Sequence, residues 1–202
     1  MKTIFSFLLA ATLINGISAQ SEDSGPTMII KTNFLPTIWS QIPGCGEFRL
    51  VYEQALPLSK SAFSVGLSYN STPLLLARLF SDAKVSGVRF QAQYKYYLSK
   101  GKYAPSGFYI GPHFSYNFAK LEDSAVLGEY IEATYMNFNG LIGYQVIADE
   151  TFALDIFSGL GYKSNTFSSN ENSSQNTSLS PESFELMSGT KFTFGFNFGI
   201  AF

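Results

Sequence analysis

The sequence predicts an all-β fold, an eight-stranded antiparallel transmembrane β-barrel that forms after a signal peptide has been cleaved. Three observations lead to this prediction. Only 14% of the 202 residues are charged, against about 25% in a typical soluble domain. Large apolar residues alternate with small or polar ones along most of the chain, which is the two-residue period of a β-strand. Finally, the segments that connect these alternating stretches are short and long in turn.

The chain opens with the pattern of a secretory signal peptide. Lys2 is followed by a run of eleven apolar or small residues (IFSFLLAATLI), and small residues precede a cleavage position after Ala19. Eleven residues are too few for a membrane-spanning helix, which needs about 20, although an N-terminal anchor is the alternative. We therefore assign 1–19 to the signal peptide, 20–27 to a short leader and 28–202 to a single barrel domain.

The mature chain divides into eight predicted strands. In the last of them, the even-numbered residues from Phe192 to Phe202 are large and apolar, while the odd-numbered residues are small or polar. The same two faces recur upstream, for example where Phe63, Val65 and Leu67 alternate with serine, glycine and alanine. The predicted strands lie near residues 28–40, 47–56, 61–70, 85–98, 107–118, 129–147, 151–163 and 184–202.

Two prolines fall inside these strands. Pro36 and Pro112 each lack the amide hydrogen that a ladder bond needs. We expect a bulge or a kink at each position, or a strand boundary near it.

The connections give the barrel an orientation. The first, third, fifth and seventh hold 6, 14, 10 and 20 residues, whereas the second, fourth and sixth hold 4, 8 and 3. Short turns at one end and long loops at the other are typical of bacterial outer-membrane barrels, with both termini on the periplasmic side. The seventh connection, 164–183, is strongly polar and is predicted to be a surface loop.

Aromatic residues fit this orientation. Two belts are expected, one at each membrane interface. Because 33 of the 202 residues are aromatic, chance placement is the alternative. The predicted outer belt holds Trp39, Tyr69, Tyr116 and Tyr162, and the predicted periplasmic belt holds Tyr94, Tyr96, Tyr144 and Phe202.

With these features in place, the chain resembles the small outer-membrane β-barrels of the OmpA/OmpX type. More closely, it resembles uncharacterised Bacteroidota outer-membrane barrel families, through an IKTN start (Ile30–Asn33), a YKYYLSKGK strand and turn (Tyr94–Lys102) and the terminal FNFGIAF. The resemblance implies location in a Gram-negative outer membrane and recognition of the strand ending at Phe202 by the barrel-assembly machinery. We expect no peptidoglycan-binding domain in this chain, so the resemblance implies no tether to the cell wall.

The polar face of the predicted strands points into the barrel. Eight strands leave an interior just wide enough for side chains, so these groups are expected to pair with one another as a polar plug. A gated path for protons or ions is the alternative. The polar face holds Glu47, Arg49, Glu53, Arg89, Gln91, Gln93, Lys95, His113, Asn137, Asn139, Gln145, Asp155 and Lys191.

One pair of residues in this set has catalytic potential. His113 and Ser115 share a face, and Glu122, Glu129 or Glu132 follows them. This pattern resembles the lipid A deacylase barrels, in which serine attacks an ester, histidine takes its proton and an acid orients the histidine. Here the pair lies on the inward phase, away from lipid, so we expect no catalytic site and a non-enzymatic protein.

The net charge and the numbers of cysteine and histidine residues exclude further classes of function. A net charge of −2 leaves no basic surface for nucleic acid. One cysteine, Cys45, and one histidine exclude a Cys/His metal site, and we expect no cofactor. The leading hypothesis is a monomeric outer-membrane barrel with a structural or surface-interaction role and an unidentified loop ligand. The rival from another class is a soluble lipocalin-like cup for a small hydrophobic ligand.

Overall fold

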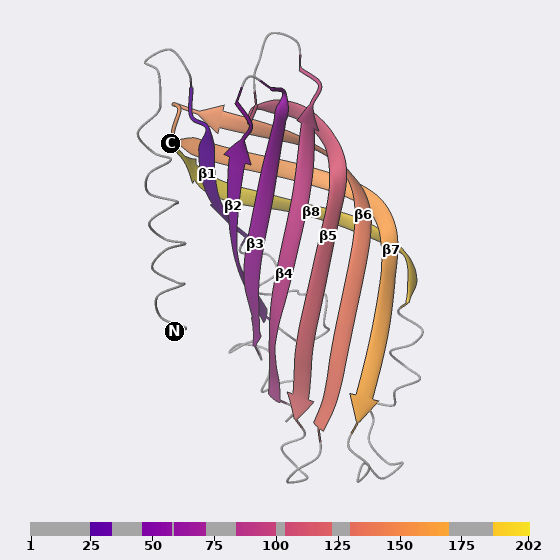
Figure 1. Ribbon diagram of the computed structural model, residues 1–202. Coiled ribbons are helices and arrows are strands. Elements are labelled where there is room, and N and C mark those ends of the chain that lie inside the picture. The colour runs from indigo at the N-terminus through magenta and orange to yellow at the C-terminus, as the bar shows by residue number, and fades with distance from the viewer. Residues whose placement is uncertain are drawn as a thin grey trace, which may run out of the picture.

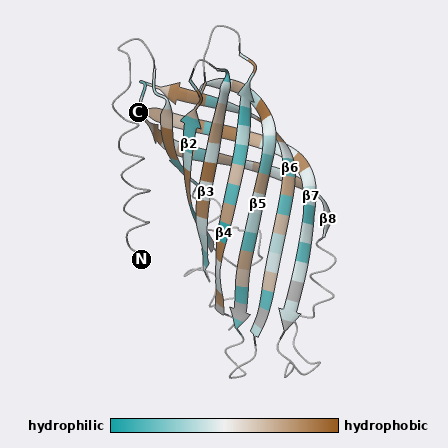
Figure 2. Cartoon of the chain, viewed as in Figure 1, coloured by the Kyte–Doolittle hydropathy of each residue, from teal (hydrophilic) through white to brown (hydrophobic). Residues whose placement is uncertain are grey.

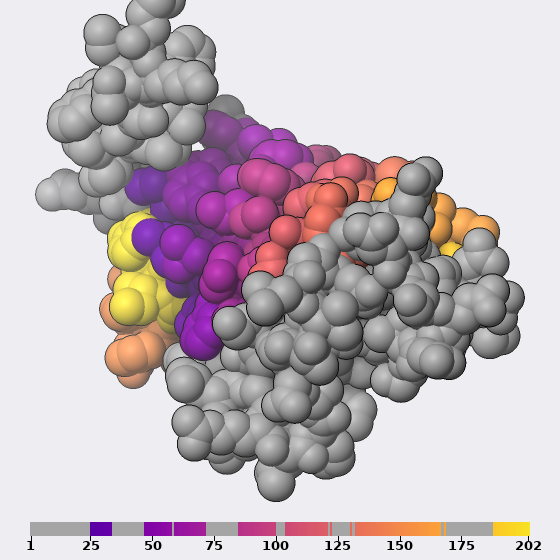
Figure 3. Space-filling view, turned by 90° about the horizontal axis from the view of Figure 1, so that it is seen from below, coloured from indigo at the N-terminus to yellow at the C-terminus, as the bar shows by residue number. Residues whose placement is uncertain are grey.

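The computed structural model describes residues 25–33, 46–57, 59–71, 84–99, 104–122, 130–169 and 188–202. They form a closed barrel in which every strand pairs with the next one in sequence, and the last pairs with the first (Figure 1). In the space-filling view the yellow atoms of the last strand lie beside the indigo of the first (Figure 3). The predicted all-β, eight-stranded fold is confirmed. The strands are β1 (Met28–Thr32), β2 (Gly46–Ala55), β3 (Ser61–Ser71), β4 (Lys84–Tyr97), β5 (Gly107–Glu122), β6 (Tyr130–Ala148), β7 (Phe152–Ser169) and β8 (Gly189–Ala201).

The strands are strongly staggered around the barrel. Followed from Ile30 across β2 to β7, the register reaches Thr190 on β8. Ile30 itself pairs with Ile200, so one circuit shifts the register from residue 190 to residue 200, by ten residues. With a rise of about 3.3 Å per residue and strands about 4.7 Å apart, this stagger tilts the strands by about 40°.

The barrel is apolar outside and polar inside. On β5, Phe108, Phe114 and Phe118 point outward and are 41–42% exposed, whereas the alternate residues Tyr109 and Ser115 are fully buried. Brown and teal residues accordingly alternate along the strands (Figure 2). The predicted alternation is confirmed, and its polarity is opposite to that of a lipocalin-like cup, which encloses its apolar face.

The outward apolar residues form a band of limited height. On β5 the band runs from Phe108 to Phe118, ten residues that rise about 25 Å along the axis of a barrel with this tilt. Beyond Phe118 the outward positions become charged, with an ion pair of 2.9 Å between Lys120 and Glu122. The band therefore ends while the strand continues, at the end of the barrel where the arrowheads of β5 and β7 lie (Figure 1).

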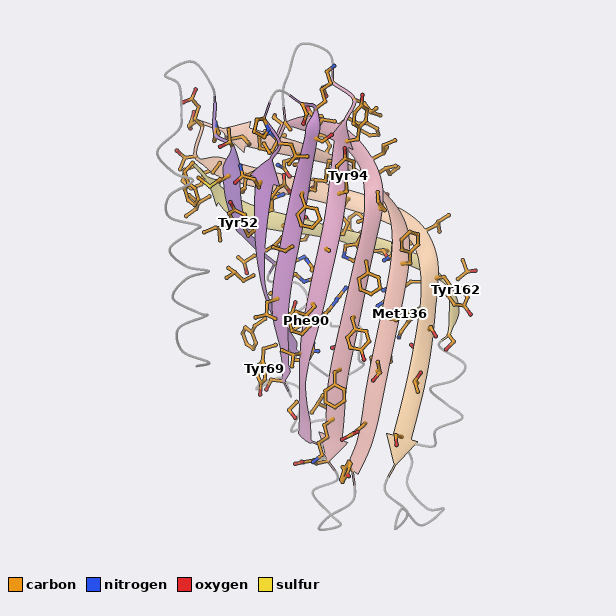
Figure 4. All side chains as sticks on the ribbon, viewed as in Figure 1. Tyr52, Tyr69, Phe90, Tyr94, Met136 and Tyr162 are labelled. Atoms are coloured by element: carbon orange, nitrogen blue, oxygen red, sulfur yellow. The ribbon has the colours of Figure 1, made fainter. Side chains whose placement is uncertain are left out.

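The predicted aromatic belts lie at two levels. Combining the register with the tilt places Tyr69, Tyr116 and Tyr162 within about 3 Å of one height. By the same conversion Tyr94 lies about 13 Å nearer the opposite end, and Tyr144 and Tyr96 lie about 17 Å nearer it. Figure 4 labels Tyr94 near one end of the barrel and Tyr69 towards the other. Trp39 lies outside the described residues.

Several strand ends differ from the prediction. Strands β5 and β7 were expected to end at 118 and 163, but they continue to Glu122 and Ser169. Apolar alternation stops at the edge of the band, whereas backbone pairing does not depend on side-chain polarity, and Ser169 still pairs with Ile131. The first part of the predicted loop 164–183 is therefore a strand, β8 begins at Gly189, and residues 170–187 lie outside the described residues. Strand β1 is described only to Thr32, so its expected continuation to residue 40, including Pro36, lies outside the described residues.

The effect of Pro112 is an interruption and not a bulge. Strands β4 and β5 pair at Gln93–His113 and again at Tyr96–Ile110, in the same register, but not at the two positions between. A side chain at Gly111 would clash with the Tyr94 carbonyl, since a Cβ there would lie 1.8 Å from its oxygen. The loss of ladder pairing was predicted correctly. Of the alternatives expected there, a bulge, a kink or a strand boundary, the bulge is not observed, because no residue is inserted.

The two ends of the chain complete the ring. The Phe202 carbonyl accepts hydrogen bonds from the amides of Thr27 (3.1 Å) and Met28 (2.9 Å), and the Phe202 amide donates to the Met28 carbonyl (2.9 Å). The predicted signal peptide and most of the leader precede the described residues. In the part of the chain that is described, no helix is both long and apolar enough to cross a membrane.

Candidate functional site

The charged side chains inside the barrel form two layers. We call the layer nearer the short turns the paired layer; it consists of Lys31, Glu53, Lys95, Tyr97, Tyr109, Gln145 and Asp155. We call the layer nearer the long connections the cationic layer; it consists of Glu47, Arg49, Arg89, Lys163 and Lys191. Converted to height along the axis, the two layers are about 15 Å apart.

The paired layer contains two ammonium groups and two carboxylates. The Lys31 Nζ lies 2.7 Å from Glu53 Oε2 and 3.0 Å from Asp155 Oδ2. The Lys95 Nζ lies 2.8 Å from the same Glu53 oxygen and 2.7 Å from the same Asp155 oxygen. Each of these side chains is at most 2% exposed. The opposite charges therefore balance within one compact group.

Neutral hydrogen-bond donors satisfy the remaining oxygens of the two carboxylates. The Tyr97 hydroxyl donates to Glu53 Oε1 at 2.9 Å, and the Tyr109 hydroxyl donates to Asp155 Oδ1 at 2.7 Å. The Gln145 amide donates to Glu53 Oε1 at 2.9 Å, and its oxygen accepts from Lys95, also at 2.9 Å. A buried ion pair is stable only when its remaining hydrogen-bonding capacity is also met, and this layer meets that condition.

The cationic layer is not balanced in this way. Glu47 Oε1 accepts from Arg49 at 2.8 Å, and Glu47 Oε2 lies 3.2 Å from Arg89 Nη1. The Lys191 ammonium donates to Asn137 at 3.3 Å, and the Lys163 ammonium lies 4.3 Å from the centre of the Tyr135 ring. Among the described inward-facing side chains of this half, Glu47 is the one carboxylate, against four cations.

The cations of this layer repel one another. Arg89, Lys163 and Arg49 all repel the Lys191 ammonium, whereas Glu47 attracts it. Repulsion of this kind is strong in a narrow interior, where water screens charges poorly. The described part of the layer carries a formal surplus of three positive charges, because four cations face one carboxylate.

A cavity of about 470 Å³ lies between and beside the two layers. Arg49, Arg89 and Lys191 line it from the cationic layer, and Glu53 and Asp155 line it from the paired layer. Apolar side chains supply another part of the wall: Val51, Leu141 and Phe157. Its volume falls within the range of small-molecule pockets, about 300–1,000 Å³.

Four buried polar atoms of residues that line this cavity have no hydrogen-bond partner among the described residues. Two are donors, the Nε of Arg89 and the Nε2 of Gln93, and two are acceptors, the Oε1 of Gln91 and the Oδ1 of Asn197. Arg89 is 3% exposed and Asn197 is 8% exposed. Buried polar atoms are partnered in the great majority of cases, so four of them in the wall of one cavity are an unusual concentration.

The structure places His113 and Ser115 inside the barrel but gives them separate partners. The Ser115 hydroxyl accepts from Arg89 and from Asn137, each at 3.1 Å. The His113 Nδ1 lies 3.1 Å from the Asn139 amide nitrogen. These contacts hold both side chains in the polar wall.

The candidate acids lie away from this pair. Glu132 is opposite Lys120 in the register, seven residues from the His113–Asn139 pair, or about 23 Å along the strand. Glu122 forms the ion pair with Lys120, and Glu129 is outside the described residues. Within the described residues no serine–histidine–acid relay is assembled. Nor does the described part of the chain contain a group of three potential metal ligands.

The sequence predicted most residues of the inner face, but it did not predict how they group into two charged layers. Four contributors are absent from the predicted polar set: Lys31, Tyr97, Tyr109 and Lys163. The alternation already puts Lys163 on the same face as Asp155, and it could have identified the other three, since each lies two residues from a position of the inward phase. The two tyrosines were missed because aromatic residues were expected on the outer face.

Comparison with known proteins gives one match. A protein-family model described as "Protein of unknown function (DUF3575)" matches residues 4–200. No curated protein and no solved structure matches the chain.

Proposed function

The chain belongs to this family of unknown function, and we propose that it is a non-enzymatic barrel of the bacterial outer membrane with a structural or surface-interaction role. In this proposal the outward residues contact lipid and the interior is a polar plug. The long connections lie outside the cell, where an unidentified ligand or partner meets them.

The outward apolar band is the observation that carries the proposal. Its height on β5, about 25 Å, equals that of the lipid-facing band of outer-membrane barrels. Its exposed large side chains range from 37% exposed for Leu154 to 67% for Phe192. Burial of one such side chain is worth about 1.5–3 kcal/mol, so a belt of them around the barrel strongly favours lipid over water.

Three further features agree with a membrane location. The aromatic residues lie at two levels, as expected for side chains at the two interfaces. The ion pair of Lys120 and Glu122 begins where the apolar band ends. The predicted signal peptide, 1–19, would direct the chain out of the cytoplasm.

The proposed partners follow from this location. Outer-membrane lipid surrounds the barrel, and the assembly machinery recognises the last strand, which ends at Phe202. Nucleic acid has no place in the proposal, because the chain is weakly acidic. A closed ring leaves no unpaired strand at its seam, and we propose a monomer.

The soluble cup and the lipid A hydrolase are less well supported. A cup needs an apolar interior, whereas charged and amide side chains line most of this one. A lipid hydrolase needs its nucleophile within reach of lipid, whereas Ser115 is fully buried.

Quenching by brominated lipid tests the proposal directly. Trp39 is first replaced by phenylalanine, and a single tryptophan is then introduced at the outward Phe90 (F90W) or at the inward Leu141 (L141W). Phe90 is 59% exposed and Leu141 is 3% exposed. In vesicles of brominated phosphatidylcholine, the tryptophan fluorescence of the F90W chain should fall several-fold, while that of the L141W chain should change little.

Two results would contradict the membrane assignment. One is equal quenching at both positions in a chain that circular dichroism shows to be folded. The other is a folded monomer that stays in the soluble fraction of cells without detergent. Recovery in the outer-membrane fraction, with heat-modifiable gel migration, is the expected result.

A further inference from the structure

We propose that the cavity between the two charged layers binds a small organic anion, such as a sugar phosphate or a hydroxy acid. This site goes beyond the proposed surface role. It also stands apart from the membrane location, because its chemistry depends only on the barrel interior.

Charge is the first argument. The paired layer neutralises two ammonium groups with two carboxylates, and each ammonium lies within 3.0 Å of both carboxylates. The cationic layer, in the same interior, sets one carboxylate against four cations among the described residues. Buried cations without counter-charges are costly, and an anion in the cavity would relieve this cost.

Geometry is the second argument. Arg49, Arg89 and Lys191 come from β2, β4 and β8, and all three line the cavity. The guanidinium groups offer planar donors suited to a carboxylate or a phosphate, and Lys191 adds a point charge. Among the described residues the Lys191 ammonium makes one hydrogen bond, to Asn137, although it has three hydrogens to donate.

The size and the lining of the cavity specify more than charge. A bare inorganic anion is small for a cavity of about 470 Å³. The amide side chains of Gln91, Gln93 and Asn197 line part of the cavity, and Val51, Leu141 and Phe157 form an apolar part of its wall. The carbon body of an organic anion would fill this space and pack against the apolar wall.

Calorimetry on the full mature chain, refolded in detergent micelles at low salt, tests the site. The probes are glucose 6-phosphate, citrate, inorganic phosphate and glucose. We expect saturable binding of glucose 6-phosphate or citrate, at least tenfold weaker binding of inorganic phosphate, and none of neutral glucose. The preferred organic probe identifies the anionic group as phosphate or carboxylate.

Three variants assign any binding to the cavity. Lys191→Gln removes a cation and should weaken organic-anion binding at least tenfold. Glu47→Gln removes the opposing carboxylate and should strengthen it several-fold. Lys120→Gln is the matched control, because this lysine lies beyond the apolar band in an ion pair with Glu122, and it should leave binding unchanged.

Several outcomes would overturn the site. These are no saturable binding of either organic anion, equal affinity for inorganic phosphate and the organic probes, or unchanged affinity in Lys191→Gln. Heat-modifiable gel migration verifies that each variant is folded. If Glu47→Gln does not refold, the Lys191→Gln and Lys120→Gln pair still decides the question.

Discussion

The two charged layers of the interior use the same residue types with opposite results. In the paired layer Lys31 and Lys95 alternate with two carboxylates, and tyrosine and glutamine donors complete the group. In the cationic layer Arg49 and Arg89 share the single carboxylate of Glu47, and two lysines have neutral partners. The paired layer is electrically balanced and can therefore stabilise the fold by itself. The cationic layer has excess positive charge and is suited to binding an anion.

The largest expected effect is in the paired layer. Asp155→Asn removes one carboxylate, which leaves two ammonium groups to share Glu53. Breaking a buried ion pair from one side costs about 3–5 kcal/mol, and we expect that loss in the free energy of unfolding. Urea titration in lipid vesicles measures it. Glu132→Gln, near the far end of β6, is the control and should change stability by less than about 0.5 kcal/mol. An equally small effect of Asp155→Asn would refute the stabilising role of this layer.

A second substitution should rescue part of the first. Adding Lys95→Met to Asp155→Asn leaves one ammonium and one carboxylate, Lys31 and Glu53, which are 2.7 Å apart. Because the charge is balanced again, we expect to regain about 2 kcal/mol relative to the single variant, since neighbouring sites are coupled. The same titrations provide the comparison. If the two losses simply add, charge balance is not what holds the layer together.

In the cationic layer, removing a cation should have the opposite sign. Lys191→Met relieves the repulsion from Arg89, Lys163 and Arg49, so stability should rise by about 0.5–1 kcal/mol at low salt. The gain should shrink in 1 M salt, where mobile ions screen the charges. A loss of stability as large as that of Asp155→Asn would mean that the two layers are equivalent, which would erase the contrast between them.

The smallest equilibrium effect is expected outside both layers, at the end of the chain. Phe202→Ala keeps the backbone hydrogen bonds to Thr27 and Met28 and changes only an outward ring. Refolding in detergent should be nearly unchanged, whereas insertion in cells should slow and periplasmic aggregates should accumulate. Pulse-labelling with membrane fractionation measures this. Equal insertion of parent and variant would show that the Phe202 side chain is not the assembly signal.

The sequence was a good guide to which face a residue occupies and a poor guide to its height. Alternation identified Glu53, Lys95 and Asp155 as inward-facing, because phase is a local property of a strand. Their meeting in one layer depends on the ten-residue stagger, which is set by the pairing of all eight strands and is not encoded in any one segment.

The alternation of apolar and polar residues also did not predict the full length of the strands. Alternation marks the part of a strand that must bury one face and expose the other, so it stops where both faces are polar. Outward positions of β7 beyond Tyr162 are serine and threonine, and the strand nevertheless pairs with β6 as far as Ser169. Alternation therefore predicts the strand segments that lie within the apolar band. It underestimates how far the strands continue beyond the band.

The seam between β1 and β8 has a consequence for biosynthesis. The residues that close the ring, Met28 on β1 and Phe202 directly after β8, are far apart in the sequence. During translation β1 is made early and can pair with β2, but its other edge has no neighbour until β8 has been made. An open strand edge is a template for wrong pairing. If the chain is exported as we propose, a carrier would therefore have to shield it in transit, and any product truncated before β8 would retain an unpaired strand.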